Sequence, residues 1–146
     1  MSLRELYQEM IVDHGREPRN FGVLPHANHC QAGHNPLCGD KLTVYLLEQN
    51  GVITDLSFEG AGCAISVASA SLMTEAVKGK TLSEFEKIFN QFHHLVTQGL
   101  QLEDSMDKLS VFSGVAEFPA RVKCATLAWH TLKAALNNEL KPISTE

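Results

Sequence analysis

Residues 42–58 read LTVYLLEQNGVITDLSF, two runs in which apolar and polar side chains largely alternate. A period of two is typical of strands that bury one face. Between the runs lies Asn50-Gly51, a dipeptide that favours a type I′ turn because both central residues of that turn need positive φ. The pattern therefore predicts an antiparallel hairpin over residues 41–59.

Apolar residues recur at helical spacing on both sides of this hairpin. They predict a first helix over about residues 2–13 and a helix of small residues over 64–77. A third helix is expected from Leu82 to about Gln98, and the last begins at Pro119, a residue that suits the first turn of a helix. Residues 16–37 are expected to form an extended loop with room for one edge strand.

The chain has the size and composition of one globular domain. It contains 146 residues, of which 44% are apolar and 20% charged, close to the average for such domains. The stretch over residues 101–114 is mostly polar, and only a short helix around Lys108 is expected in it. We find no internal repeat or linker, so a single domain over residues 1–146 is predicted.

Charge and hydropathy exclude two classes of partner. The net charge is −5 with no long basic run, so nucleic acid is not an expected partner. No stretch approaches the about 18 consecutive apolar residues that a membrane span needs, so no membrane association is expected. Without an export signal the protein is expected in the cytoplasm, where its four cysteines favour thiolate chemistry or metal binding over disulfides.

Three of the cysteines fall at the ends of predicted elements, where sites usually form. Cys38-Gly39-Asp40 comes just before a strand, Cys63 lies between a strand and a helix N-terminus, and Cys124 lies in the first turn of the last helix. Thiolates and carboxylates hold zinc and iron, so these residues are candidate ligands. Taken singly, each cysteine can equally be a small buried apolar residue.

Two cationic residues lie next to one of these candidate ligands, Cys124, in the sequence. Three thiolates and one carboxylate around a divalent metal sum to roughly −2, which calls for a positive charge nearby. Arg121 and Lys123 lie in the first turn of the last predicted helix, where cations oppose the helix dipole. We interpret them as supporting a metal site, with ordinary surface charges as the alternative.

Seven further residues could take part in chemistry. The spacing of those in residues 26–34 matches no usual zinc-finger pattern, and the others lie on polar faces of predicted helices. Exposed loop or helix-surface positions are the simpler interpretation for the histidines, and the role of the cysteine is left open. The seven are His26, His29, Cys30, His34, His93, His94 and His130.

Five short motifs occur in one order along the chain. They are Asp13-His14, Pro18-Arg19-Asn20, Cys38-Gly39-Asp40, Phe58-Glu59-Gly60-Ala61-Gly62-Cys63-Ala64-Ile65-Ser66 and Phe118-Pro119-Ala120-Arg121-Val122-Lys123-Cys124-Ala125. Together they resemble the IscU/NifU-like iron-sulfur cluster assembly proteins over nearly the whole chain. The chain is most similar to the SufU branch, because Lys123 stands where scaffold-type IscU proteins have histidine. The polar stretch near residues 98–107 would hold the insertion typical of that branch.

The resemblance implies a fold and a metal site. The expected fold is α+β and SufE/NifU-like, a small antiparallel sheet of about three strands with helices packed on one face. The implied zinc ligands are Cys38, Asp40, Cys63 and Cys124.

The resemblance also implies a function, that of a zinc-dependent sulfurtransferase. Cys38 would accept persulfide sulfur from a SufS-type cysteine desulfurase and pass it toward downstream iron-sulfur assembly proteins. Its place in a loop also favours Cys38, because loops move more readily than helix ends. Two alternatives stay open: a scaffold that holds iron in a [2Fe-2S] cluster, and a structural zinc module.

Overall fold

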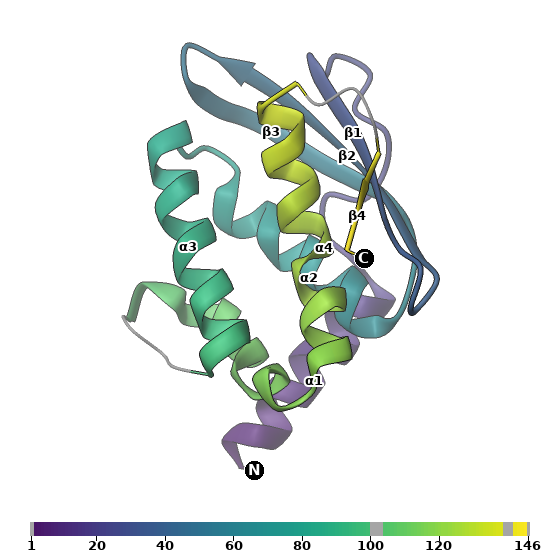
Figure 1. Cartoon of the computed structure of the whole chain (residues 1–146). Coiled ribbons are helices and arrows are strands. Elements are labelled where there is room, and N and C mark those ends of the chain that lie inside the picture. The colour runs from purple at the N-terminus through teal and green to yellow at the C-terminus, as the bar shows by residue number, and fades with distance from the viewer. Residues whose placement is uncertain (1, 100–103, 139–141, 146) are drawn as a thin grey trace.

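The computed structural model describes residues 2–99, 104–138 and 142–145. Four strands and five helices follow one another along these ranges (Figure 1). In chain order they are α1 (Leu3–Arg16), β1 (His29–Asn35), β2 (Asp40–Gln49), β3 (Val52–Ala61), α2 (Ala64–Val77), α3 (Leu82–Gln98), the 3-10 helix η1 (Asp104–Glu117), α4 (Pro119–Leu136) and β4 (Ile143–Ser144).

The predicted hairpin is confirmed. Strands β2 and β3 pair antiparallel, and the turn between them has positive φ at both Asn50 (55°) and Gly51 (77°). Leu42, Val44 and Leu46 of β2 are buried at 2% exposure or less. The alternating pattern therefore marks the face of the hairpin that packs into the core.

The sheet has one strand more than expected. Its order is β3-β2-β1-β4, with β1 antiparallel to β2 and β4 parallel to β1 at Gly33 and His34. The strand expected within residues 16–37 is β1, and it lies inside the sheet rather than at its edge because β4 pairs with it. A two-residue strand shows no period, so the sequence pattern could not predict β4.

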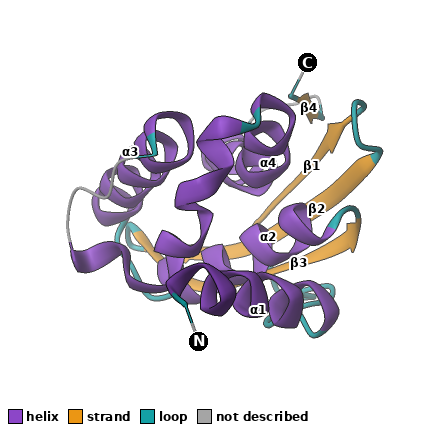
Figure 2. Ribbon diagram, turned by 90° about the horizontal axis from the view of Figure 1, so that it is seen from below, coloured by secondary structure: helices purple, strands orange, loops and turns teal. Residues whose placement is uncertain are grey.

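All the helices lie on one side of the sheet, as predicted (Figure 2). Helices α2 and α4 contact the strands, α1 packs on α2, and α3 and η1 pack around α4. The short helix expected around Lys108 is part of η1, while residues 100–103 of the expected insertion lie outside the described residues. Within the ranges described, no helix combines the length and apolar character needed to cross a membrane.

Helix α1 is longer than predicted. It runs through Gly15 to Arg16, although the sequence pattern predicted a helix only to about residue 13. His14 is buried in the interface with α2, where its Nδ1 lies 2.7 Å from the Ser71 hydroxyl. A Cβ on Gly15 would lie 3.4 Å from Ala64. Packing of this last turn against α2 thus continues the helix past the glycine.

The contact between α2 and α4 fixes the start of α4. The Trp129 indole N–H donates to the Ser69 hydroxyl at 3.1 Å, and this hydroxyl donates to the Ala125 carbonyl at 2.5 Å. Trp129 also stacks on Phe92 with 4.4 Å between the ring centroids. Since Ala125 directly follows Cys124, the same contact sets the position of that cysteine.

Phe92→Ala is expected to lower the free energy of unfolding by about 3–5 kcal/mol, because Phe92 is 1% exposed and its loss leaves a cavity against Trp129. Chemical denaturation of both proteins measures the difference. The control is Val23→Ala, at a residue 58% exposed, which should stay within about 0.5 kcal/mol of the parent protein. A similar small loss in Phe92→Ala would contradict the proposed packing.

Candidate metal centre

The fold brings three of the predicted ligands together from distant parts of the chain. Cys38 lies in the loop between β1 and β2, Asp40 begins β2, and Cys124 lies near the start of α4. One donor atom from each lies within 4.8 Å of the other two. The Sγ atoms of Cys38 and Cys124 are 3.1 Å apart, although the residues are 86 positions apart in sequence.

Asp40 lies at the centre of this group and has no solvent exposure. Its Oδ1 accepts a hydrogen bond from the Cys63 backbone N–H at 2.8 Å, and its Oδ2 accepts one from the Asn35 amide at 3.3 Å. No Lys, Arg or His in the described ranges forms an ion pair with it. A buried carboxylate without a cation is costly, so the donor set fits a bound metal ion.

Cys63 approaches the group from the start of α2. It is the N-cap residue, and its Sγ accepts a hydrogen bond from the Ser66 backbone N–H at 3.4 Å. The first turn of the helix thus supplies a backbone N–H donor to this sulfur. The Cys63 sulfur lies 3.9 Å from Asp40 Oδ2 but outside the closer set of three donors.

Gly62 allows the end of β3 to pass close to Asp40. A Cβ at this position would lie 2.5 Å from Asp40 Oδ1, which is closer than any real side chain could lie. The glycine before Cys63 therefore lets the Cys63 N–H reach the carboxylate. Gly62 is thus needed for close approach to Asp40, and Cys63 for its donor groups.

Burial differs among the three thiols of the site. Cys124 is buried, Cys63 is half-buried and Cys38 is exposed. Burial, followed by hydrogen bonds with the Cys38 and Cys63 thiols, raises the pKa of Cys124 above its ordinary value. Without a metal this thiol is therefore protonated at neutral pH, and a metal that binds it displaces the proton.

Arg121 and Lys123 do not pair with the site in this structure. Both side chains are exposed, and the Arg121 guanidinium lies over the Phe118 ring at 4.3 Å from its centroid. Lys123 borders a hollow on α4 together with His130. Over the described part of the chain, neither cation forms an ion pair with Asp40. Their supporting role stays a prediction.

The remaining cysteine and histidines lie elsewhere. Cys30 is exposed and pairs across β1 and β2 with Tyr45, while His29 Nδ1 lies 2.9 Å from the Ala135 carbonyl. His93 and His130 face each other with ring centroids 5.9 Å apart. In the part of the chain the structure describes, no second group of three metal-binding donors converges.

Sequence reasoning missed Asn35. Its side chain is 1% exposed, and its amide lies within hydrogen-bonding distance of both Asp40 Oδ2 and Cys124 Sγ, at 3.3 and 3.5 Å. In β1 the residues that face the helices alternate as Gln31, Gly33 and Asn35. A polar residue in phase with the buried face of a strand needs a buried hydrogen-bond partner. This phase is the one sequence signal that could have identified Asn35.

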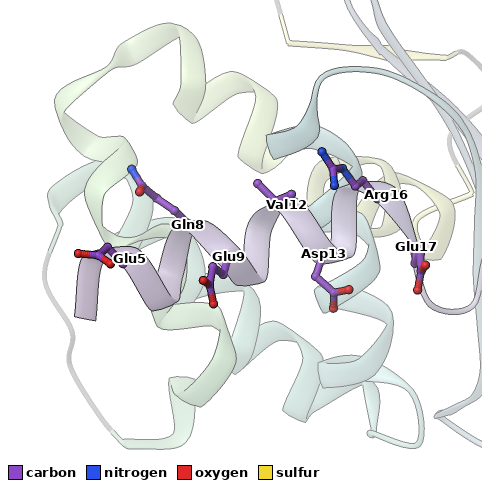
Figure 3. A pocket seen from close by; sticks show the side chains of 7 residues that line it. All are labelled: Glu5, Gln8, Glu9, Val12, Asp13, Arg16 and Glu17. Carbon is purple, nitrogen blue, oxygen red and sulfur yellow. The ribbon is translucent and has the colours of Figure 1, made fainter. Parts of the chain in front are cut away.

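A separate hollow of about 530 Å³ lies on the outer face of α1 (Figure 3). It is lined by the acidic side chains of Glu5, Glu9, Asp13 and Glu17, with Gln8, Val12 and Arg16. It contains no thiol, and none of the predicted site residues borders it. The predicted site residues lie instead at the cysteine cluster, where the exposed Cys38 thiol can react without an enclosed cavity.

Comparisons with known proteins show which family the chain resembles. The family model described as NifU-like N terminal domain matches residues 6–142. The chain is 41% identical over 143 residues to the zinc-dependent sulfurtransferase SufU of Bacillus subtilis, covering 94% of each chain. It is 37% identical to the iron-sulfur cluster assembly scaffold protein IscU of Thermotoga maritima, covering 97% of this chain and all of the relative.

A solved structure has the same fold. A candidate iron-sulfur cluster assembly scaffold protein for the SUF system from Fervidobacterium islandicum superposes with a TM-score of 0.83 at 34% identity. The match covers 92% of this chain and 99% of that one. The α+β arrangement that surrounds the cysteine cluster is therefore shared with this protein.

Gly62→Ala is expected to push Asp40 out of place, because the added Cβ overlaps Asp40 Oδ1. The free energy of unfolding of the metal-free protein should fall by about 1–3 kcal/mol, and zinc affinity should fall with it. Chemical denaturation and a zinc competition titration measure the two effects. The matched control is Gly114→Ala, where a Cβ meets nothing within 4 Å; equal behaviour of the two variants would contradict the close approach.

Proposed function

Because the chain belongs to the NifU-like N-terminal domain family of iron-sulfur cluster assembly, we propose that it carries sulfur for that assembly. In this proposal Cys38 accepts persulfide sulfur from a SufS-type cysteine desulfurase and passes it to downstream assembly proteins. The relative from Bacillus subtilis is named a zinc-dependent sulfurtransferase, which supports transfer over other roles within the family.

One observation carries the assignment to Cys38. It is the exposed thiol of the cluster, beside the buried Cys124 and the fully buried Asp40. Gly39 follows it with a φ of 72° and open space around it, so the backbone at this point is not confined by packing. A donor can therefore reach the Cys38 sulfur while the inner donors stay covered.

The proposed metal is zinc, held by Cys38, Asp40, Cys63 and Cys124. The donor set supports it, because thiolates and a carboxylate suit zinc and Asp40 has no cation among the residues the structure describes. When bound, zinc keeps cysteine sulfurs in the thiolate form.

The transfer step is a thiol–disulfide exchange. The Cys38 thiolate attacks the outer sulfur of the persulfide on the desulfurase, and a new sulfur–sulfur bond forms at Cys38. The sulfur–sulfur bond of the donor breaks, and the donor cysteine leaves as a thiolate. No oxidant is consumed, because one sulfur–sulfur bond replaces another. The inner position of Asp40 and Cys124 lets both stay in place during this exchange.

A [2Fe-2S] scaffold is the second candidate. The Thermotoga maritima relative is named a scaffold protein, and three thiolates with a carboxylate also suit iron. Lys123, directly before Cys124, favours sulfur transfer in our interpretation of the branch. A purely structural zinc module fits less well, since structural zinc sites are usually built from cysteine and histidine alone and this donor set includes the Asp40 carboxylate.

Purified protein is expected to be colourless and to contain one zinc per chain. Cys63→Ala and Cys124→Ala should each lose most of that zinc, because each removes a donor, while Cys30→Ala should keep it. Elemental analysis and visible absorbance measure the outcome. A brown, iron-loaded protein would favour the scaffold, and full zinc content in both site variants would rule out the proposed ligands.

Incubation with a cysteine desulfurase and cysteine is expected to add sulfur to Cys38. Intact mass and peptide mapping should find the added sulfur in the parent protein and in Cys30→Ser, the matched control with the other exposed thiol removed. Cys38→Ser should carry none and should no longer stimulate the desulfurase. Added sulfur on Cys63, Cys124 or Cys30, with Cys38 unmodified, would overturn the assignment.

A further inference from the structure

Asn35 closes the loop that carries Cys38. It is the last residue of β1 and pairs in register with Asp40, the first residue of β2. The loop between this pair holds Cys38 and Gly39. Cys38 is exposed whereas Asn35 is 1% exposed, so the loop reaches solvent while its base lies in the core.

The Asn35 side chain makes three contacts that fix how its amide is turned. Its Oδ1 accepts from the Leu37 backbone N–H at 3.3 Å. Its Nδ2 donates to Asp40 Oδ2 at 3.3 Å and lies 3.5 Å from Cys124 Sγ. The opposite orientation would set the amide oxygen against a carboxylate oxygen and the NH₂ group against a backbone N–H, so only this one satisfies all partners.

These contacts divide the cluster into two parts. The amide reaches the donor atoms of Asp40 and Cys124, the two fully or nearly fully buried residues, and none of the three contacts above is with the Cys38 sulfur. Donors that bond to metal ligands in this way orient the ligands and tune their strength. Asn35 therefore acts on the inner half of the site and leaves the outer thiol free.

We propose that Asn35 is a positioning residue that holds Asp40 and Cys124 in their ligand geometry, independently of Cys38. The inference rests on the proposed function, under which Cys38 must leave its place among the donors to take up sulfur. With Asn35 present, the buried carboxylate and the buried thiolate keep their orientation during that step.

Two variants distinguish the donor function of the Asn35 amide from its acceptor function. Asn35→Asp has nearly the same shape and keeps an acceptor for the Leu37 N–H, but as an ionised carboxylate it cannot donate to Asp40 or Cys124. Asn35→Leu removes both functions at similar volume. The matched controls are Asn28→Asp and Asn28→Leu, since Asn28 also bonds β2 through its amide, to the backbone of Glu48, and lies outside the cysteine cluster.

The readouts are zinc affinity, by competition with a chromophoric chelator, and the absorption spectrum of the fully Co²⁺-loaded protein. Both Asn35 variants should bind zinc about 10- to 100-fold more weakly than the parent. Their sulfur-to-cobalt and ligand-field bands should shift, because the donor orientation changes. The Asn28 variants should match the parent in both. Parent-like affinity, or weaker affinity with an unchanged cobalt spectrum, would overturn the proposal, and either variant alone is sufficient if the other does not fold.

A double-variant cycle tests independence from Cys38. Asn35→Asp should weaken zinc binding by the same factor in the parent and in Cys38→Ser. An effect that disappears in Cys38→Ser would show that Asn35 acts through the loop and would refute the proposal. None of these measurements uses a desulfurase. If the parent protein took up no sulfur, the proposed function would be refuted, and the zinc and cobalt measurements would still decide the role of Asn35.

Discussion

The burial of the Asp40 carboxylate is the constraint around which this molecule is arranged. A charge with no solvent exposure needs donors on each oxygen, and it receives them from Asn35 and from the backbone of Cys63. Asn35 ends β1 and Cys63 is the N-cap of α2, so the end of β1 and the start of α2 must meet at Asp40. Gly62 makes that meeting sterically possible. These hydrogen-bond donors carry no net positive charge, which a bound metal ion would supply.

The helical layer completes the same arrangement from the other side. Helix α2 consists mostly of small residues that are buried, and α4 approaches it closely through the contacts of Ser69 with Trp129 and the Ala125 carbonyl. This contact brings Cys124 over Asp40. Asp40 and Cys124 thus lie buried on a strand and a helix, whereas Cys38 lies exposed on the loop between β1 and β2. Within one site, therefore, Asp40 and Cys124 are shielded from solvent while Cys38 is accessible.

Local patterns predicted much of this architecture, and their limits have physical causes. The hairpin followed from the Asn50-Gly51 turn, and the cysteines were placed at element ends by the same periodicity. The sequence could not predict β4, which depends on tertiary pairing with Gly33. It also could not predict Asn35, whose partners are distant in sequence. The supporting role of Arg121 stays a prediction, and in this structure its guanidinium lies over the Phe118 ring.

The alternation of side chains along β1 has a consequence for the route of sulfur. Asn35 faces the helices, whereas Cys30 lies out of phase with it and is exposed beside Tyr45 on the opposite face of the sheet. A sulfur atom on Cys38 therefore has no internal relay to the other exposed thiol, because the sheet lies between them. Under the proposed function, sulfur therefore arrives at and departs from the same exposed atom, the Cys38 sulfur. Donor and recipient would then compete for one surface and bind in turn, so that delivery follows a ping-pong order.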